Sequence, residues 1–448
     1  MKVPRQDDTI VARATPPGRG GIAVIRVSGP LVGDIAASML GETPEPRHAE
    51  LRNFVDASGE LIDSGIALLF PTPHSFTGED VLELQGHGGA MVSDLLIERA
   101  IELGARIAEP GEFSRRAFLN DRMDLVQAEA IADLIDSDSR SAARAAQRSL
   151  RGDFSAVVMD LNECVTQLRT HVEAAIDFPE EEIDFLQDDA LLERIAGADR
   201  QFRDLERVVR QGCLLRDGVT VVVAGRPNVG KSSLLNALAG YDAAIVTDIA
   251  GTTRDVVREQ LDLDGLPLHV VDTAGLRDWT DRVEEEGIRR ARAELKSADH
   301  ALIVLDASCA DNDLGALTAE LPPELGYTVV RNKIDLTGDP TGPVADGPIN
   351  VSALKRDGID ALRDHLKSAL GYQPPPEGAM TARRRHLESL AEAREHFEKA
   401  RQHLEQHAAG ELMAEELLQV QNALAEITGE FHNDDLLGLI FAGFCVGK

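Results

Sequence analysis

The chain carries Gly225-Arg226-Pro227-Asn228-Val229-Gly230-Lys231-Ser232, which fits the pattern G-x-x-x-x-G-K-[ST] of a phosphate-binding loop. The β-branched run Val219–Ala224 precedes it and predicts a buried strand, and Ser233–Leu238 follows it and predicts an amphipathic helix. A strand, a glycine-rich loop and a helix N-terminus together direct backbone N–H groups at phosphate. In such a loop Lys231 reaches the outer phosphates and the Ser232 hydroxyl can ligate Mg²⁺. The stretch therefore predicts a nucleotide-binding domain.

Two later stretches predict that the base is guanine. Asn332-Lys333-Ile334-Asp335 fits the N-K-x-D of GTP-binding proteins, and the Asp335 carboxylate can accept both N1–H and N2–H of guanine. Adenine cannot make this contact, so ATP would leave a buried carboxylate unpaired. Asn350–Leu354 follows the next predicted strand and supplies backbone near the guanine O6.

Two further segments predict the magnesium and γ-phosphate contacts. Asp272-Thr273-Ala274-Gly275 is a D-x-x-G at a strand end, where Asp272 can hold the water shell of Mg²⁺ and the Gly275 amide can sense the γ-phosphate. Gly251–Asp255 places Thr253 as a second hydroxyl ligand to Mg²⁺. The candidate GTP-binding residues are Asn228, Val229, Gly230, Lys231, Ser232, Ser233, Thr247, Asp248, Ile249, Ala250, Gly251, Thr252, Thr253, Asp272, Thr273, Ala274, Gly275, Asn332, Lys333, Asp335, Ser352, Ala353 and Leu354.

The hydrolytic mechanism is less evident from these motifs. Many small GTPases place a water-orienting glutamine directly after D-x-x-G, but this chain has Leu276 there. One substitute is a monovalent cation held by Asn228 and by carbonyls of residues 247–252, which would supply positive charge beside the phosphates. The other is a carboxylate of Glu284-Glu285-Glu286 that positions water, although acidic residues also favour helix N-termini. The residues alone leave these alternatives open.

The whole chain of 448 residues predicts a multidomain α/β protein. Residues 1–121 predict an N-terminal α+β domain, with strands at 9–12, 22–27, 66–70 and 81–84 and helices at 31–40 and from residue 90. Residues 122–215 and 373–448 predict one discontinuous all-α domain, whose buried helical face includes Leu161, Val165, Leu168 and Val172. Residues 216–372 predict an inserted P-loop GTPase domain of Ras-like type, with a parallel sheet.

Composition limits the partners and the compartment. Lys plus Arg number 46 against 77 Asp plus Glu, a net charge of −31, so binding to a nucleic acid would require a local basic patch or a partner. Arg383-Arg384-Arg385 is the densest basic cluster, although a solvated helix face explains it better. The four cysteines form no C-x-x-C pair, and neither a signal peptide nor a membrane-length apolar run is present. We expect a cytoplasmic protein.

Motifs along almost the whole length resemble the MnmE (TrmE) family of tRNA modification GTPases. They are Thr15–Gly21, Ser75–Asp80, Leu84–Gly89, Pro110–Phe113, Asp177–Pro179, Gly225–Ser233, Asp248–Asp255, Ile427–Glu430 and the terminal Phe444–Lys448. The resemblance implies a K⁺-activated, Mg²⁺-dependent GTPase whose hydrolysis drives a conformational change. It implies addition of a carboxymethylaminomethyl-type group to C5 of the wobble uridine (position 34) of certain tRNAs, with a one-carbon unit from 5-formyl- or methylene-tetrahydrofolate.

The resemblance also assigns roles to residues of this chain. The K⁺ ligands correspond to Asn228, Thr247, Ile249 and Thr252, and the Mg²⁺ ligands correspond to Ser232 and Thr253. The catalytic carboxylate corresponds to Glu284. The reduced folate falls on Arg26, Glu83, Arg122 and Lys448, where the family pattern has lysine in place of Arg122. Cys445 is the tail residue able to act as a nucleophile, although a free cysteine is more often a packed hydrophobe.

The implied partners are a second copy of the chain and an FAD-dependent, MnmG/GidA-like protein, together forming a heterotetramer. Because this chain is acidic, we expect the partner to make most of the tRNA contacts. The alternative function is a regulatory GTPase switch in ribosome assembly that performs no RNA chemistry. The glycine-rich N-terminal domain and the Cys445 tail argue against that alternative.

Overall fold

The structure is a computed structural model that describes residues 8–137, 139–177, 189–239, 258–272, 298–309, 314–319, 321–345, 347–372, 378–407, 409–430, 434–444 and 447. The chain divides into two compact units. The first comprises Met1–Ala132, Leu150–Ile195 and Glu392–Lys448, and the second comprises Asp133–Ser149 and Ala196–Ala391. Helices α4 (Leu125–Ile135), α7 (Asp189–Asp217) and α12 (Arg384–His407) contribute residues to both units. The three-domain boundaries proposed above stay a prediction.

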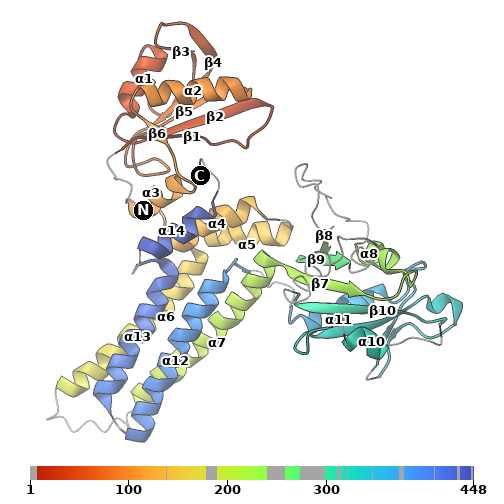
Figure 1. Cartoon of the computed structure of the whole chain (residues 1–448). Coiled ribbons are helices and arrows are strands. Elements are labelled where there is room, and N and C mark those ends of the chain that lie inside the picture. Colours follow the sequence, from red (N-terminus) through yellow and green to blue (C-terminus); the bar gives the residue numbers. More distant parts are fainter. Residues whose placement is uncertain are drawn as a thin grey trace. The chain divides into compact units, whose positions relative to one another are not determined.

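The first unit contains a six-stranded sheet of order β3-β4-β5-β2-β1-β6 (Figure 1). Its neighbouring strands are antiparallel except for β1 and β6, which are parallel. Helices α1, α2 and α3 connect or follow these strands. The elements are β1 (Ile10–Arg13), β2 (Gly20–Ser28), α1 (Val32–Leu40), β3 (Glu50–Val55), β4 (Leu61–Phe70), β5 (Val81–Gly88), α2 (Ala90–Glu102), β6 (Arg106–Ile107) and α3 (Glu112–Leu119).

The two faces of this sheet carry different side chains, because successive residues of a strand point to opposite sides. Ile25 pairs with Leu84 across β2 and β5, and both are fully buried in a core that also contains apolar residues of α1 and α2. Arg26 pairs with Glu83 one position along and therefore lies on the other face. A smaller cluster with Phe113 of α3 covers that second face near β1.

Long helices complete the first unit. Helix α6 (Asp153–Asp177) packs along α13 (Gly410–Thr428), and Figure 1 shows the two side by side. Leu161, Val165, Leu168 and Val172 are all buried on α6, as the 3–4 spacing predicts. A shorter helix, α14 (Asp434–Ala442), was not anticipated from the sequence; its Leu437 and Phe441 pack with Phe118 and Leu125.

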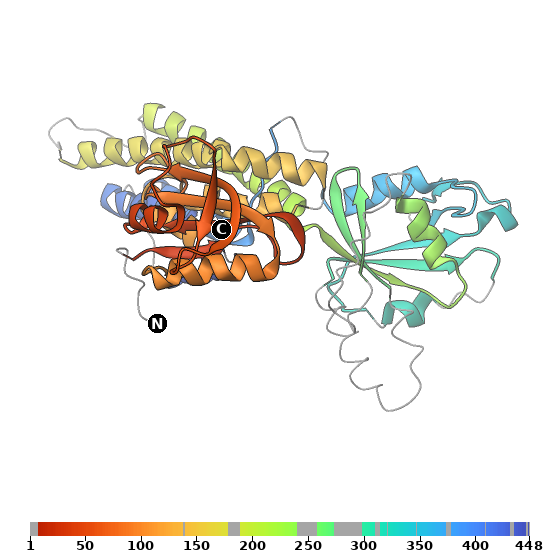
Figure 2. The same ribbon diagram turned by 90° about the horizontal axis from the view of Figure 1, so that it is seen from above.

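The second unit contains a seven-stranded sheet of order β12-β13-β11-β10-β7-β9-β8 (Figure 2). Its central strands are parallel, and only the β8–β9 and β12–β13 pairs in the described residues are antiparallel. The elements are α5 (Arg140–Leu150), β7 (Val219–Ala224), α8 (Lys231–Ala239), β8 (Arg258–Leu263), β9 (Leu266–Asp272), β10 (His300–Asp306), α10 (Leu314–Ala319), β11 (Tyr327–Asn332), η3 (Ile334–Leu336), β12 (Gly342–Pro343), β13 (Ile349–Asn350) and α11 (Ile359–Ala369).

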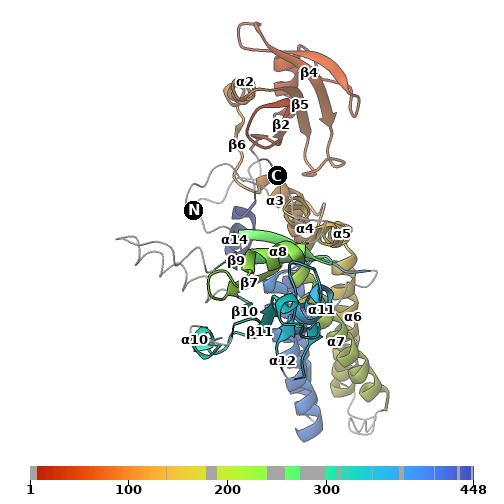
Figure 3. The ribbon, with the colours of Figure 1, turned by 90° about the vertical axis from the view of Figure 1, so that its right-hand side faces the viewer.

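Helices cover both faces of this second sheet. Apolar residues of α8 and α11 share one core with alternate residues of β7, β10 and β11. Leu317 of α10 packs with Ile303 and Leu305 on the opposite face, and Figure 3 shows α10 on the far side of the sheet from α11. This doubly wound, mixed α/β arrangement confirms the predicted fold class.

Most predicted elements appear, and the differences have simple causes. Strand β5 extends beyond the predicted residues 81–84 through Gly86 and His87, because Gly86 and Gly88 permit close approach of Asp63 and of the Gly20 backbone. Strands β3 and β8 were not predicted, since neither has the run of β-branched residues found in β7. In the described part of the chain, no helix is long and apolar enough to cross a membrane.

Candidate functional site

The phosphate-binding loop joins β7 to α8, and two of its glycines are sterically required. A Cβ at Gly225 would lie 2.5 Å from the Val304 carbonyl oxygen of the neighbouring strand. Gly230 has a φ of +92°, and a Cβ there would lie 2.4 Å from Asn332 Nδ2. Helix α8 begins at the next residue, Lys231. The loop therefore presents its backbone at a helix N-terminus, as an anion site requires.

Asn332 holds the phosphate loop against the two base-recognition segments. Its Nδ2 donates to the Val229 carbonyl at 3.0 Å, and its Oδ1 accepts from the Ala353 amide at 3.0 Å. Asn332 is almost fully buried at the end of β11. Since one side chain bonds both loops, the geometry of the base site depends on that of the phosphate site.

Two lysine side chains donate hydrogen bonds to backbone carbonyls of the phosphate loop. Lys231 Nζ donates to the carbonyls of Gly225 at 3.0 Å and Arg226 at 3.2 Å. Lys333 Nζ donates to the Asn228 carbonyl at 2.6 Å and to Asp306 Oδ2 at 2.7 Å. Burial raises the pKa of Asp306, but hydrogen bonds from Lys333 and Ser308 outweigh it and hold that pKa below 3.8. Asp306, which sequence reasoning missed, thus positions Lys333.

The predicted guanine-reading carboxylate is held in place by a second segment. Asp335 Oδ1 accepts from Ser352 Oγ at 2.6 Å, and Ser352 is fully buried. Leu354 is 84% exposed and lies two residues further along.

Asn228 and the predicted magnesium ligand Ser232 are both exposed, in the loop and at the start of α8. Asn228 adopts a left-handed conformation with φ +66°, which asparagine tolerates better than most residues. Asp272 ends β9 beside Val223 of β7, so the D-x-x-G segment begins next to the phosphate loop. Thr247–Thr253, Thr273–Gly275, Leu276 and Glu284 lie outside the described residues.

Two of the predicted folate residues, Arg26 and Glu83, lie on the second face of the first unit's sheet. Arg26 Nε and Nη2 donate to Glu83 Oε1 at 2.9 and 2.8 Å, a close pair that leaves the other carboxylate oxygen available. The Arg26 guanidinium also lies 5.2 Å from the ring centre of Phe76 and 5.7 Å from that of Phe113. These two rings were quoted within sequence motifs but were not recognised as site residues. Phe113 is fully buried, so of these four side chains Arg26, Glu83 and the half-buried Phe76 can offer charge and aromatic surface to a flat heterocycle.

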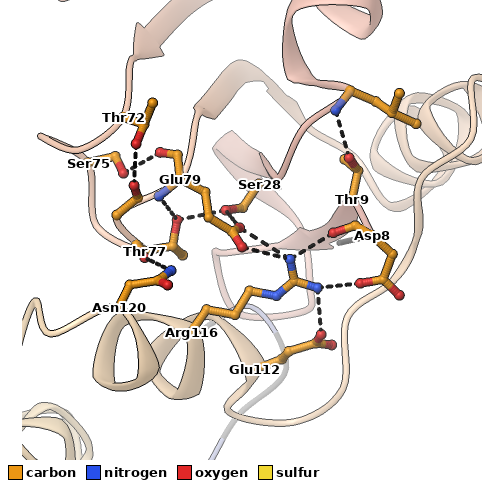
Figure 4. A network of polar contacts seen from close by, with 12 residues as sticks. Asp8, Thr9, Ser28, Thr72, Ser75, Thr77, Glu79, Glu112, Arg116 and Asn120 are labelled. Atoms are coloured by element: carbon orange, nitrogen blue, oxygen red, sulfur yellow. Dashed lines mark hydrogen bonds and ion pairs between the residues drawn. The ribbon is translucent and has the colours of Figure 1, made fainter. Parts of the chain in front are cut away.

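A buried ionic network supports the loop that carries Phe76 (Figure 4). Arg116 of α3 donates to Glu79 Oε1 at 3.1 Å, to Asp8 Oδ1 at 2.7 Å and to Glu112 Oε1 at 3.0 Å. Glu79 also accepts from Ser28 Oγ at 2.7 Å. Burial raises the pKa of Glu112, but hydrogen bonds from Arg106, the Glu109 amide and Arg116 outweigh it and hold that pKa below 4.5.

Two chain segments approach this face. Arg122 is exposed after α3 and borders Gly78, since a Cβ at Gly78 would lie 3.2 Å from its Cγ. The second segment is the C-terminal one. A Cβ added at Gly111 would meet Phe441 and Phe444 of this segment, and a Cβ added at Gly447 would lie 2.3 Å from the Arg13 carbonyl oxygen. The end of the chain thus packs onto the N-terminal sheet region. Cys445 and Lys448 themselves lie outside the described residues.

Comparison with known families matches nearly the entire chain. Residues 9–122 match the family described as "GTP-binding protein TrmE N-terminus", and residues 125–445 match "MnmE helical domain". Two similar relatives are tRNA modification GTPases MnmE, from Haemophilus influenzae (strain PittEE) at 55% identity and from Pasteurella multocida (strain Pm70) at 56%. Each alignment spans 98% of this chain and 100% of the relative.

Among solved structures, the chain is similar to the G-domain of FeoB from Methanococcus jannaschii, at 25% identity. That match covers 34% of this chain and 98% of the other, with a TM-score of 0.26.

Proposed function

Because the chain belongs to the MnmE (TrmE) family of tRNA modification GTPases, we propose that it uses GTP hydrolysis to drive modification of the wobble uridine at C5. The group added is of the carboxymethylaminomethyl type, and its one-carbon unit comes from a reduced folate. A second copy of the chain and an FAD-dependent partner complete the working assembly. That the chain is a GTP-hydrolysing enzyme acting in tRNA modification follows from its family.

The observation that carries the proposal is the junction made by Asn332. It bonds the Val229 carbonyl of the phosphate loop and the Ala353 amide of the base loop with one amide group, while Ser352 orients Asp335. Phosphate and guanine are therefore recognised by one connected set of groups. This supports GTP as the nucleotide over ATP, which lacks the two donors that Asp335 accepts from.

Hydrolysis at this site requires a substitute for the missing glutamine. We assign water positioning to Glu284, and K⁺ coordination to Asn228 with Thr247, Ile249 and Thr252. The exposed side chain of Asn228, on a loop whose carbonyls already attract Lys231 and Lys333, is a suitable oxygen donor. When bound, K⁺ supplies positive charge beside the phosphates; Ser232 and Thr253 hold Mg²⁺.

The second face of the N-terminal sheet suits a folate. Glu83 can accept from the amide and amine donors of a pterin, and the half-buried Phe76 offers a ring for stacking beside Arg26. The exposed Arg122 offers its guanidinium to the glutamate tail, and Lys448 is a further cation for it. When bound, the folate supplies the one-carbon unit for the modification.

Nucleoside analysis tests the function directly. Digested tRNA from cells that lack this protein should contain unmodified wobble uridine by mass spectrometry, and the intact chain supplied from a plasmid should restore the modified nucleoside. A chain with Lys231→Ala should not restore it, because the outer phosphates lose their cation. An unchanged nucleoside profile in the deletion strain would exclude the proposed reaction and favour a switch that performs no RNA chemistry.

A further inference from the structure

Helix α5 (Arg140–Leu150) presents a row of arginines in a strongly acidic protein. Residues 139–152 have the sequence SRSAARAAQRSLRG, with four arginines and no acidic residue, whereas the chain as a whole has 77 acidic residues against 46 basic ones. Arg140, Arg144 and Arg148 recur at intervals of four, so they form a stripe along one side of the helix. We call these three residues the α5 arginine ladder.

The opposite side of α5 is packed, which fixes the orientation of the ladder. Ala142, Ala145, Ala146 and Ser149 are buried, and Ser149 Oγ donates to the Thr381 carbonyl at 3.1 Å within the second unit. Arg140 and Arg144 are exposed, and Arg148 is half-buried beside Gly378. The packed face therefore leaves Arg140 and Arg144 toward solvent, with Arg148 partly covered.

Two nearby carboxylates are paired with other cations. Asp133 accepts from Arg216 at 2.8 Å and from Arg383 at 2.7 Å. Asp264, at the β8–β9 turn next to the start of α5, pairs with Lys367 at 2.9 Å. Among the described residues, no carboxylate lies within ion-pair distance of a ladder arginine. Asp136, before the helix, is exposed and also unpaired.

This arrangement costs stability to the isolated helix. Like charges four residues apart repel by about 0.2–0.5 kcal/mol per pair. Arg140 also sits in the first turn, where the helix dipole disfavours a cation and where α5 has no acidic residue. A bound polyanion would relieve both effects.

We infer that the α5 arginine ladder binds the phosphate backbone of tRNA, an inference that deepens the proposed function and rests on it. Guanidinium groups bind phosphate in a bidentate manner, and four helical residues rise about 6 Å, close to the step between consecutive phosphates of a strand. The ladder carries alanine and glutamine between its arginines, and no large exposed apolar residue of α5 supplies the centre that a protein interface needs.

Arg383-Arg384-Arg385 is the densest basic cluster of the sequence, and the structure does not favour it as a phosphate-binding site. Arg383 is committed to the buried carboxylate of Asp133, and Arg384 lies 3.7 Å from Glu388. A high density of basic residues in the sequence is therefore a poorer guide to a phosphate-binding site than the absence of an ion-pair partner among the described residues.

The test compares two double variants of the full chain. Arg140→Gln/Arg144→Gln removes two unpaired ladder charges, whereas Arg203→Gln/Arg207→Gln removes two exposed arginines of α7 that pair with Asp199 and Asp204. Glutamine keeps helix propensity similar, and all four positions lie outside the GTP contacts. Binding of a tRNA transcript is measured by fluorescence anisotropy between about 50 and 200 mM KCl, the range over which phosphate contacts dominate.

For the ladder variant we expect the slope of log K against log salt to fall in magnitude by about two, and tRNA affinity to fall on the order of ten-fold. The α7 variant should behave as the wild type, and both variants should retain basal GTPase activity and thermal midpoint. An unchanged slope in the ladder variant, an equal loss in both variants, or no salt-dependent tRNA binding by the wild type would overturn the inference. Loss of association with a protein partner at an unchanged tRNA slope would show that the ladder contacts protein instead. Normal wobble uridine in the deletion strain, with the ladder effect present, would overturn the proposed reaction alone.

Discussion

Asp335 is the residue at which base specificity can be altered by one atom. Its Oδ1 accepts from Ser352 Oγ, so the carboxylate is held in one orientation. In Asp335→Asn an amide N–H₂ takes the place of one acceptor oxygen. Xanthine has a carbonyl where guanine has its 2-amino group, and we therefore expect GTP affinity to fall about 10²-fold or more while XTP binding is gained.

Displacement of a fluorescent guanine nucleotide by GTP, ATP and XTP measures this exchange of specificity. Asp339→Asn, in the same segment but paired with Arg331, is the control and should leave all three affinities unchanged. A uniform loss of all nucleotides in Asp335→Asn would mean that the site had collapsed, and would contradict a specific role in base recognition.

Glu284 is expected to act on the transition state more than on binding. Glu284→Ala should lower kcat on the order of 10²-fold and leave GTP affinity within a factor of two, because positioning a water contributes little to the ground state. Stopped-flow binding and single-turnover hydrolysis separate the two quantities. Glu285→Ala is the matched neighbour and should change neither; a parallel loss of affinity and kcat in Glu284→Ala would refute the assignment.

At the scale of elements, ionic contacts of Arg116 link helix α3 to Asp8, just before β1, and to Glu79 of the Ser75–Asp80 loop. Burial raises the pKa of Asp8, but Arg106 and Arg116 outweigh it, and the pKa of Glu112 is lowered in the same way. A carboxylate whose pKa is lower when folded stabilises the fold above its unfolded pKa, and this stabilisation is lost as the pH falls through the folded value.

We therefore expect the thermal midpoint of the chain to fall as the pH decreases from about 5 to 3, where these groups take up protons. In Arg116→Met the thermal midpoint at neutral pH should be lower than in the wild type. The midpoint should also decrease less steeply as the pH falls, because Asp8 and Glu112 lose a cation that lowers their pKa. Circular dichroism melts across this range measure both. Arg99→Met removes a pair with the exposed Glu102 and should keep the wild-type pH dependence; the same slope in Arg116→Met would show that the network does not control acid stability.

The elements that the sequence could predict are those whose pattern is local. The buried strand β7, the loop after it and the 3–4 stripe of α6 follow from β-branched runs, glycines and apolar spacing. Contacts between distant segments are different, because no local pattern records them. Asn332 was quoted for base recognition, yet its bond to Val229, 103 positions earlier, appears only in the structure. The Arg26–Glu83 pair likewise depends on strand register.

At the scale of the whole molecule, the net charge of −31 and the ladder on α5 are compatible because they act over different distances. At about 0.15 M salt, charges more than about 8 Å apart are largely screened, so three local arginines can bind phosphate within an acidic protein. General repulsion then limits non-specific RNA binding, and a partner can still provide most of the contacts.

Cation-dependent association of two nucleotide-binding domains is the prediction that concerns the assembled protein. If K⁺ at Asn228 orders residues 247–252, GTP binding should bring the domains of two subunits together in KCl but not in NaCl of equal ionic strength. Cys309 is exposed, whereas burial raises the pKa of the Cys213 thiol to about 12 and also raises that of Cys164, so a maleimide dye should label Cys309 selectively once Cys445 is replaced by serine.

Energy transfer between donor- and acceptor-labelled subunits, measured with a non-hydrolysable GTP analogue, should rise in KCl and stay low in NaCl. Asn228→Ala should abolish the rise, because it removes the side-chain oxygen proposed to bind the ion, whereas Asn236→Ala, an exposed asparagine of α8, should not. Equal energy transfer in KCl and NaCl, or a full rise in Asn228→Ala, would contradict K⁺ binding at Asn228. GTP binding without K⁺ would then explain the association of the domains.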